Sequence, residues 1–167
     1  MISNNFDVPG NYAGATIYNV SPVRGGDAYL FVYDDVTFLF DSGFGFSSGI
    51  LHDKIKAVLG DRPLDYILLT HSHYDQCLGS AHLSKVYPDL KVVAFSYAAR
   101  VMGKEGARAT MLRLDKAAAE VNGSDVVFED IDNLHADIIV EDGEKIMLGS
   151  HEAQVVLLPG HTRDSVG

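Results

Sequence analysis

The chain has 167 residues, 47% of them hydrophobic, and a formal net charge of −10 at pH 7. This length and hydrophobic content predict one globular domain over residues 1–167 and exclude a disordered chain. The strong negative charge makes nucleic acid and anionic membrane surfaces poor partners, because both would repel it.

A single cysteine, Cys77, excludes an intrachain disulfide and with it a disulfide-stapled secreted domain. Residues 1–7 lack the basic and apolar segments of a signal peptide. No run approaches the roughly 18 apolar residues of a membrane span. We therefore expect a cytoplasmic protein.

The N-terminal third predicts β-structure. Residues 15–20 alternate loosely between apolar and polar, and two apolar runs, 28–33 and 36–40, flank Asp34-Asp35. This arrangement is typical of a hairpin with a tight turn. The second run is apolar on both faces, which predicts a strand buried on both sides.

Helices and strands alternate in the middle of the chain. After a glycine-rich loop at 41–45, a helix begins with Ser47 or Ser48 as its N-cap and ends at Gly60. The elements predicted next are a strand at 66–69, a helix at 77–86 closed by Pro88, a strand at 91–95 and a longer helix ending at Asn122-Gly123. The apolar stripe of the longer helix consists of Met111, Leu114, Ala118 and Val121.

An acidic surface connection at 124–136 leads to the last predicted strands. Residues 137–140 and 145–148 flank Asp142-Gly143, a strong hairpin signal. A final strand at 153–158 runs into the sequence Pro159-Gly160-His161-Thr162. Strands at both ends with helices between them predict a mixed α/β sandwich.

Potential metal ligands follow the predicted strand at 66–69. His71, His73 and Asp75 occupy every second position, and every second side chain of an extended segment points the same way. Imidazole and carboxylate groups are suitable ligands for zinc or a similar divalent ion. His161 is distant in sequence but also follows a strand, so it could complete a three-histidine site.

The remaining four of the seven histidines have no partner at ligand spacing. We interpret His52, His82 and His135 as surface or helix-face residues and His151 as the start of a strand. A lone His-x-His is also a weak signal. What strengthens it here is the preceding apolar strand, the aspartate that follows, and the later Pro-Gly-His-Thr.

Three motifs in this order resemble the metallo-β-lactamase fold superfamily. Its signature loop reads Thr-His-x-His-x-Asp-His, and residues 70–76 read Thr-His-Ser-His-Tyr-Asp-Gln. An aspartate after a β-hairpin, here Asp41, and a later Pro-Gly-His-Thr, here residues 159–162, match two further motifs. The resemblance, which extends to glyoxalase II-like hydrolases, implies an αββα sandwich, of which this chain holds largely the N-terminal half.

The resemblance also implies roles for individual residues. His71, His73 and His161 match the first metal site of the family, and Asp75 matches a ligand of the second. Asp41 matches an aspartate that supports the site through hydrogen bonds. Asp75 is also the expected catalytic residue, because a nearby carboxylate can orient a water or accept its proton.

The chemistry of such a site favours hydrolysis. Three neutral imidazoles leave Zn²⁺ with its full charge and an open position, where the pKa of a bound water falls to ~7. The expected substrate is therefore a small molecule with an ester, thioester, lactone or lactam bond. A diiron oxygen or nitric oxide reductase is disfavoured, because those relatives carry glutamate where His73 stands.

Two departures from the family pattern limit this prediction. Gln76 replaces a histidine of the second metal site, and a neutral carboxamide is a weak zinc ligand. The resemblance therefore predicts either one or two bound zinc ions. Gln76 fits a natural single-metal enzyme, a degenerate binding protein or a deliberate inactivating change. The alternative function is accordingly a non-catalytic metal- or ligand-binding protein.

The second departure is that the chain ends at Gly167, before the family's later ligands and second half. We therefore expect a truncated chain with one open sheet face, covered by a homodimer partner or by a complementing C-terminal half.

Overall fold

The structure, a computed structural model, describes residues 10–12 and 14–167. Residues 1–7, where no signal peptide is predicted, lie outside the described residues. Within the described part of the chain, no helix is long and apolar enough to cross a membrane.

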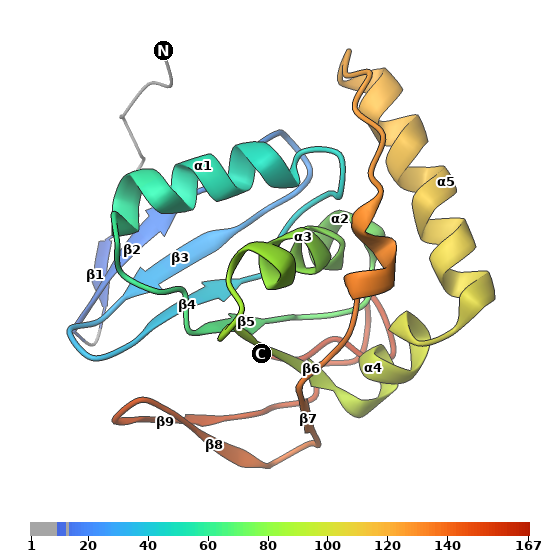
Figure 1. The fold of residues 1–167 in the computed structure, drawn as a ribbon. Coiled ribbons are helices and arrows are strands. Elements are labelled where there is room, and N and C mark those ends of the chain that lie inside the picture. Colours follow the sequence, from blue (N-terminus) through green and yellow to red (C-terminus); the bar gives the residue numbers. More distant parts are fainter. Residues whose placement is uncertain (1–9, 13) are drawn as a thin grey trace.

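A seven-stranded mixed sheet forms the centre of the molecule, with its strands in chain order (Figure 1). The first four strands are antiparallel neighbours, and β4 to β7 run parallel to one another. The carboxyl ends of these four parallel strands therefore meet at one edge of the sheet. The strands are β1 (Gly10–Tyr12), β2 (Ala15–Asn19), β3 (Tyr29–Val32), β4 (Thr37–Phe40), β5 (Tyr66–Leu68), β6 (Lys91–Phe95) and β7 (Ile138–Val140).

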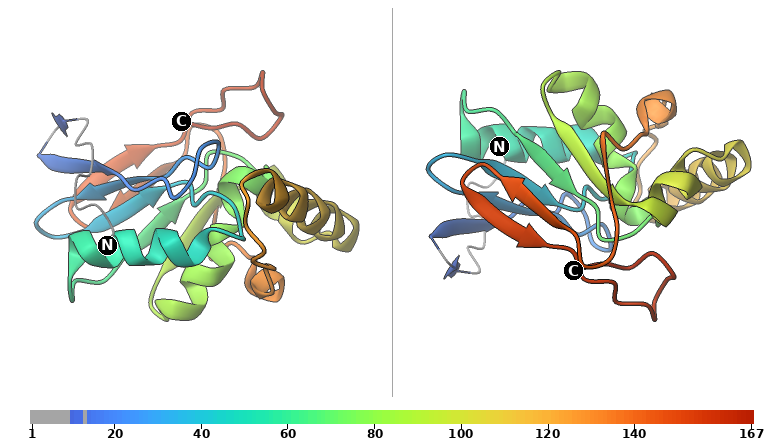
Figure 2. Two further views of the ribbon diagram at one scale, coloured as in Figure 1. Left: turned by 90° about the horizontal axis from the view of Figure 1, so that it is seen from above. Right: turned by 90° about the horizontal axis from the view of Figure 1, so that it is seen from below.

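Helices connect the parallel strands. Figure 2 shows α1 (Ser48–Leu59) and α3 (Gly79–Val86) against one face of the sheet. The short α2 (Tyr74–Cys77) precedes α3. The connection from β6 to β7 contains α4 (Ser96–Met102), α5 (Glu105–Val121) and the 3₁₀ helix η1 (Asp130–Asn133).

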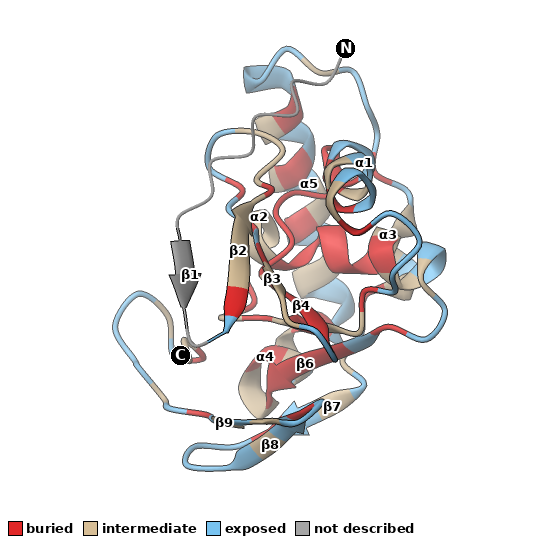
Figure 3. Cartoon of the chain, turned by 90° about the vertical axis from the view of Figure 1, so that its left-hand side faces the viewer, coloured by how far each residue is buried: buried red, intermediate tan, exposed pale blue. Residues whose placement is uncertain are grey.

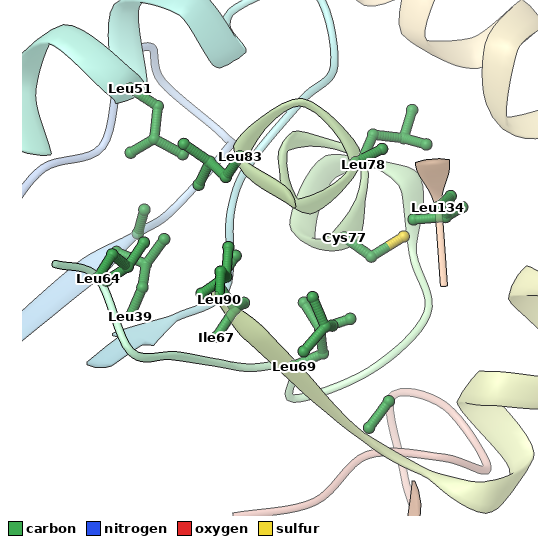
Figure 4. Packing of buried hydrophobic residues seen from close by; sticks show 14 of the residues in the cluster. Leu39, Leu51, Leu64, Ile67, Leu69, Cys77, Leu78, Leu83, Leu90 and Leu134 are labelled. Atoms are coloured by element: carbon green, nitrogen blue, oxygen red, sulfur yellow. The ribbon is translucent and has the colours of Figure 1, made fainter. Parts of the chain in front are cut away.

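The main core lies between this helical layer and the sheet (Figure 4). Leu51 of α1 and Leu83 of α3 pack in one cluster with Leu39 and Ile67 of the central strands, and all four are fully buried. Burying side chains of this size contributes about 1.5–3 kcal/mol each. The core therefore fixes the edge of the sheet where β4 and β5 end.

A separate two-stranded sheet, β8 (Lys145–Leu148) and β9 (His151–Gln154), lies against the opposite face (Figure 3). It covers Val93 and Val140, but a cavity of about 130 Å³ with almost entirely apolar walls remains beneath it. Further along the same face, the aromatic rings of Phe31 and Phe40 are only partly buried. The predicted α/β sandwich is confirmed, and this second face is incompletely covered.

The predicted β3–β4 hairpin is also confirmed. The amide of Tyr33 donates to the carbonyl of Val36 at 2.9 Å across the Asp34-Asp35 turn. Three of the four residues of β4 are buried, as expected for a strand covered on both faces.

The predicted hairpin around Asp142-Gly143 is wrong. Residues 138–140 pair with β6 in the large sheet, whereas β8 pairs with β9 across a turn at Gly149-Ser150. Gly149 has a φ of +59°, which suits a tight turn, and the Asp35 carboxylate accepts the Ser150 amide at 2.8 Å. The predicted strand at 153–158 is correspondingly shorter: after β9, residues 156–158 pair with 165–167.

The predicted stripe of the long helix is shifted. In α5 the buried residues are Met111, Asp115 and Ala119, while Val121 is 87% exposed. An apolar pattern cannot reveal this register, because its central buried residue is a carboxylate. The single helix predicted at 77–86 is instead split, at Leu78, into α2 and α3.

Candidate metal site

The site forms where β4 and β5 end side by side. Asp41 follows β4, and Thr70 and His71 follow β5 by two and three residues. Asp41 adopts a left-handed conformation, with φ of +55°, which is uncommon for a residue other than glycine. This conformation places its side chain against Thr70.

Hydrogen bonds link Asp41 to His71 through Thr70. The two oxygens of the Asp41 carboxylate accept the Thr70 amide at 2.8 Å and the Thr70 hydroxyl at 2.7 Å. The same hydroxyl lies 2.9 Å from Nδ1 of His71. When Asp41 is ionised, the hydroxyl gives its one proton to the carboxylate and accepts the proton of Nδ1. Nε2 of His71 is then left with its lone pair free to bind a metal.

The protonation states in this chain follow from burial. Burial raises the pKa of Asp41 to about 7, with further raising by Asp75 and Asp27, although the hydrogen bonds from Thr70 oppose the rise. Burial also lowers the pKa of His71, as do the neighbouring His73 and His161. The His71 imidazole is therefore neutral at pH 7, the form that ligates metal.

Three histidine side chains converge. One ring nitrogen from each of His71, His73 and His161 lies within 4.8 Å of the others, and Nε2 of His161 is 3.1 Å from Nδ1 of His73. Tetrahedral zinc with imidazole ligands requires nitrogen separations of about 3.3 Å. Nε2 of His71 is buried without a hydrogen-bond partner. An unsatisfied buried nitrogen beside two others fits a divalent ion, so these residues can hold one.

His161 reaches this point on a loop far along the sequence. The loop is closed by pairing of Leu158 with Ser165 and of Val156 with Gly167. It is attached to the strand end because the Val166 amide donates to the Thr70 carbonyl at 2.9 Å.

The sequence analysis missed Asp164. This side chain is 3% exposed, and its Oδ2 accepts the amide of Ser72, the residue between His71 and His73, at 2.8 Å. The only signal in the sequence was its position three residues after His161.

Asp75 and Gln76 stand apart from the three histidines. Asp75 is the second residue of α2, and its Oδ1 is buried without a hydrogen-bond partner. The Asp75 side chain nevertheless lies outside the three-histidine group. The Gln76 carbonyl accepts the amide and hydroxyl of Ser42 at 2.7 and 2.9 Å. Asp75 as second-site ligand and proton acceptor therefore stays a prediction.

A hollow of about 540 Å³ adjoins the site on the incompletely covered face of the sheet. Asp27, Asp41, Thr70, His71 and Gln76 line it together with the aromatic rings of Tyr29, Phe31 and Phe40. The His71 side chain therefore borders this hollow.

The loop after Asp41 is held by a second buried carboxylate that the sequence did not reveal. Asp115 of α5 accepts the amides of Gly45 and Phe46 at 2.8 and 3.0 Å. Burial raises the pKa of Asp115 to about 6, although both hydrogen bonds oppose the rise. Gly79 lets α3 approach this loop, since a Cβ there would lie 2.0 Å from the Ser42 carbonyl oxygen.

Cys77 is a packing residue. It is fully buried in the main core, where its thiol donates to the Ser72 carbonyl at 3.6 Å, and burial raises its pKa well above the usual range. The thiol therefore stays protonated in this environment, and it does not belong to the three-histidine group within the described chain.

The other four histidines take part in separate contacts. His82 pairs with Asp130 at 2.8 Å, His135 lies near Asp137, and His151 begins β9 as predicted. His52 packs edge-on against His82. None of them belongs to the three-histidine group within the described chain.

The family model of the metallo-beta-lactamase superfamily matches residues 21–167. The chain belongs to this superfamily. No curated protein matches the sequence significantly.

Solved structures of metallo-beta-lactamases share the fold. A Cronobacter sakazakii enzyme with a HARLDQ motif has a TM-score of 0.65 and 22% identity over 94% of this chain and 56% of its own. The subclass B3 enzyme BJP-1 of Bradyrhizobium japonicum has a TM-score of 0.65 and 21% identity over 96% and 56%. The MIM-2 metallo-beta-lactamase has a TM-score of 0.66 and 27% identity over 95% and 53%. The chain thus spans a little over half the length of these proteins.

The three-histidine site makes a direct prediction. His71→Ala or His161→Ala should abolish zinc binding, measured by isothermal titration and elemental analysis, because each removes one of three ligands. His135→Ala, outside the group, should bind zinc like the unchanged chain. Equal loss of zinc in His135→Ala would contradict the ligand assignment.

Proposed function

We propose that the chain forms the metal-binding part of a zinc-dependent hydrolase. Its substrate would be a small molecule with an ester, thioester, lactone or lactam bond. The observation that carries the proposal is the buried, unpartnered Nε2 of His71 facing His73 and His161. Such a nitrogen is costly to bury in a purely structural role, because it forgoes its hydrogen bond to water.

Each residue of the site would have a separate role. His71, His73 and His161 would hold one divalent ion, which when bound supplies a Lewis acid for the carbonyl oxygen and lowers the pKa of a water. The Asp41–Thr70 pair orients the His71 ring and fixes its tautomer, as outer-shell partners of metal ligands do. Asp75 would accept the proton of the attacking water through its free carboxylate oxygen.

Gln76 supports a single tightly held ion. Its carboxamide carries no charge, and its backbone is already engaged with Ser42. Glutamine at this place is not peculiar to the chain, because the HARLDQ motif agrees with residues 71–76, HSHYDQ, at its first, fifth and sixth letters. We therefore favour a natural single-metal site over an inactivating change.

A non-catalytic metal- or ligand-binding protein is the second candidate. Gln76 favours it, because loss of a second ion would weaken any chemistry that needs two. The three first-site histidines and the open hollow beside His71 are compatible with either function.

Metal content and activity separate the two. The chain should bind one zinc, and Gln76→His should add a second, weaker site. The zinc-loaded chain should hydrolyse members of a panel of generic esters and thioesters, and a chelator should abolish this activity.

His135→Ala should keep both zinc and turnover, which makes it the matched control. Two zinc ions in the unchanged chain would contradict the interpretation of Gln76. One tightly bound zinc without turnover of any substrate in the panel would favour the non-catalytic function.

We further propose that a second polypeptide, either another copy of the chain or a complementing C-terminal half, covers the open sheet face. Partly buried Phe31 and Phe40 and the apolar cavity under β8–β9 support this, because monomeric proteins rarely expose large apolar patches. A cytoplasmic setting is in keeping with the lone, buried Cys77.

The homodimer makes a simple prediction. Light scattering of the purified chain should give twice the chain mass of 18.1 kDa. A stable, compact monomer would contradict the dimer.

A further inference from the structure

The third histidine of the site lies on a separate loop, far along the sequence from the other two. His71 and His73 follow closely after β5, whereas His161 lies on a loop between residues 158 and 165 that extends from the strands (Figure 2). A three-ligand site needs this loop in a fixed position, because an error of a fraction of an ångström misplaces the third nitrogen.

Besides the 3.1 Å contact between the rings of His161 and His73, two hydrogen bonds among the described residues join the loop to the segment that carries His71 and His73. One is between backbone groups, from the Val166 amide to the Thr70 carbonyl at 2.9 Å. The other is the bond of the Ser72 amide to Oδ2 of Asp164 at 2.8 Å. The second bond depends on a side chain that is not itself one of the three histidines, and its donor lies between His71 and His73 in the sequence.

Both partners of this second bond are sheltered from water. Ser72 is 7% exposed and Asp164 is 3% exposed. Burial tends to raise the pKa of Asp164, but the bonds from Ser72 and Thr162 outweigh it and hold this pKa below its usual value. Both oxygens of the Asp164 carboxylate are therefore acceptors, and one of them is taken by the Ser72 amide.

We propose that Asp164 is the positioning residue that sets His161 in register with His71 and His73, through its hydrogen bond to the Ser72 amide. This inference rests on the proposed metal site and specifies which group aligns its third ligand. Asp164 does not belong to the three-histidine group among the described residues, and it acts through the backbone between His71 and His73.

Two nearly isosteric substitutions distinguish the hydrogen-bonding role of the Asp164 side chain from the space that it fills. Asp164→Asn keeps a carbonyl oxygen that can accept the Ser72 amide, whereas Asp164→Leu fills the space without an acceptor. Zinc affinity measured by isothermal titration should stay close to that of the unchanged chain in Asp164→Asn. It should fall about 10–100-fold in Asp164→Leu, as is usual when an outer-shell partner of a metal site is removed.

A matched control comes from elsewhere in the sheet. Asp137 also uses a carboxylate oxygen to accept a backbone amide, that of Val92, at 2.9 Å. Asp137→Leu should lower the melting temperature but leave zinc affinity unchanged. With Co²⁺ in place of zinc, the visible absorption bands, which report ligand geometry, should change in Asp164→Leu and not in Asp137→Leu.

The outcomes distinguish this inference from the proposed function. If the unchanged chain binds no zinc, the proposed function fails and the inference with it. If the unchanged chain binds zinc and Asp164→Leu binds it equally tightly, the positioning role alone is overturned. Loss of affinity in Asp164→Asn as large as in Asp164→Leu would also overturn it, since the charge and not the acceptor would then matter. If Asp164→Leu does not fold, Asp164→Ser, whose side chain is too short to replace the acceptor, should show the same loss.

Discussion

The site depends on a buried carboxylate at the junction of two parallel strands. Asp41 leaves β4 in a left-handed conformation and accepts two hydrogen bonds from Thr70 at the end of β5. Those bonds join the strand ends, and the Thr70 hydroxyl transmits the constraint to Nδ1 of His71. Burying Asp41 raises its pKa to about 7, so its position is maintained against a desolvation cost. An arrangement of this kind is expected where function requires a fixed ligand.

Around this junction, the chain holds the site from three directions. The leucine-rich core under α1 and α3 fixes the strand ends, Asp115 of α5 fixes the loop after Asp41, and Asp164 fixes the loop that carries His161. These three supports together position the three histidine side chains near one another. Preorganisation of this kind reduces the ordering that metal binding must bring about.

The sequence predicted what is local and missed what is distant. The β3–β4 hairpin follows from the two apolar runs around Asp34-Asp35, and the candidate metal-binding residues follow from their spacing and from the family motifs. The pairing of β8 with β9 could not be predicted from the local sequence, because Asp142-Gly143 is as good a turn sequence as Gly149-Ser150. The choice between them is made by contacts such as that of Asp35 with Ser150, 115 residues apart. Asp115 and Asp164 were missed for the same reason, since each acts on a backbone amide about 70 or 92 residues away.

The central claim is that three imidazole nitrogens, and no other protein group, form the first metal site. X-ray absorption at the zinc edge of the loaded chain tests it most directly. The account predicts three imidazole nitrogens at about 2.0–2.1 Å and no sulfur, because Cys77 is buried in the core and lies outside the three-histidine group. A sulfur ligand, or fewer than three imidazoles, would contradict it.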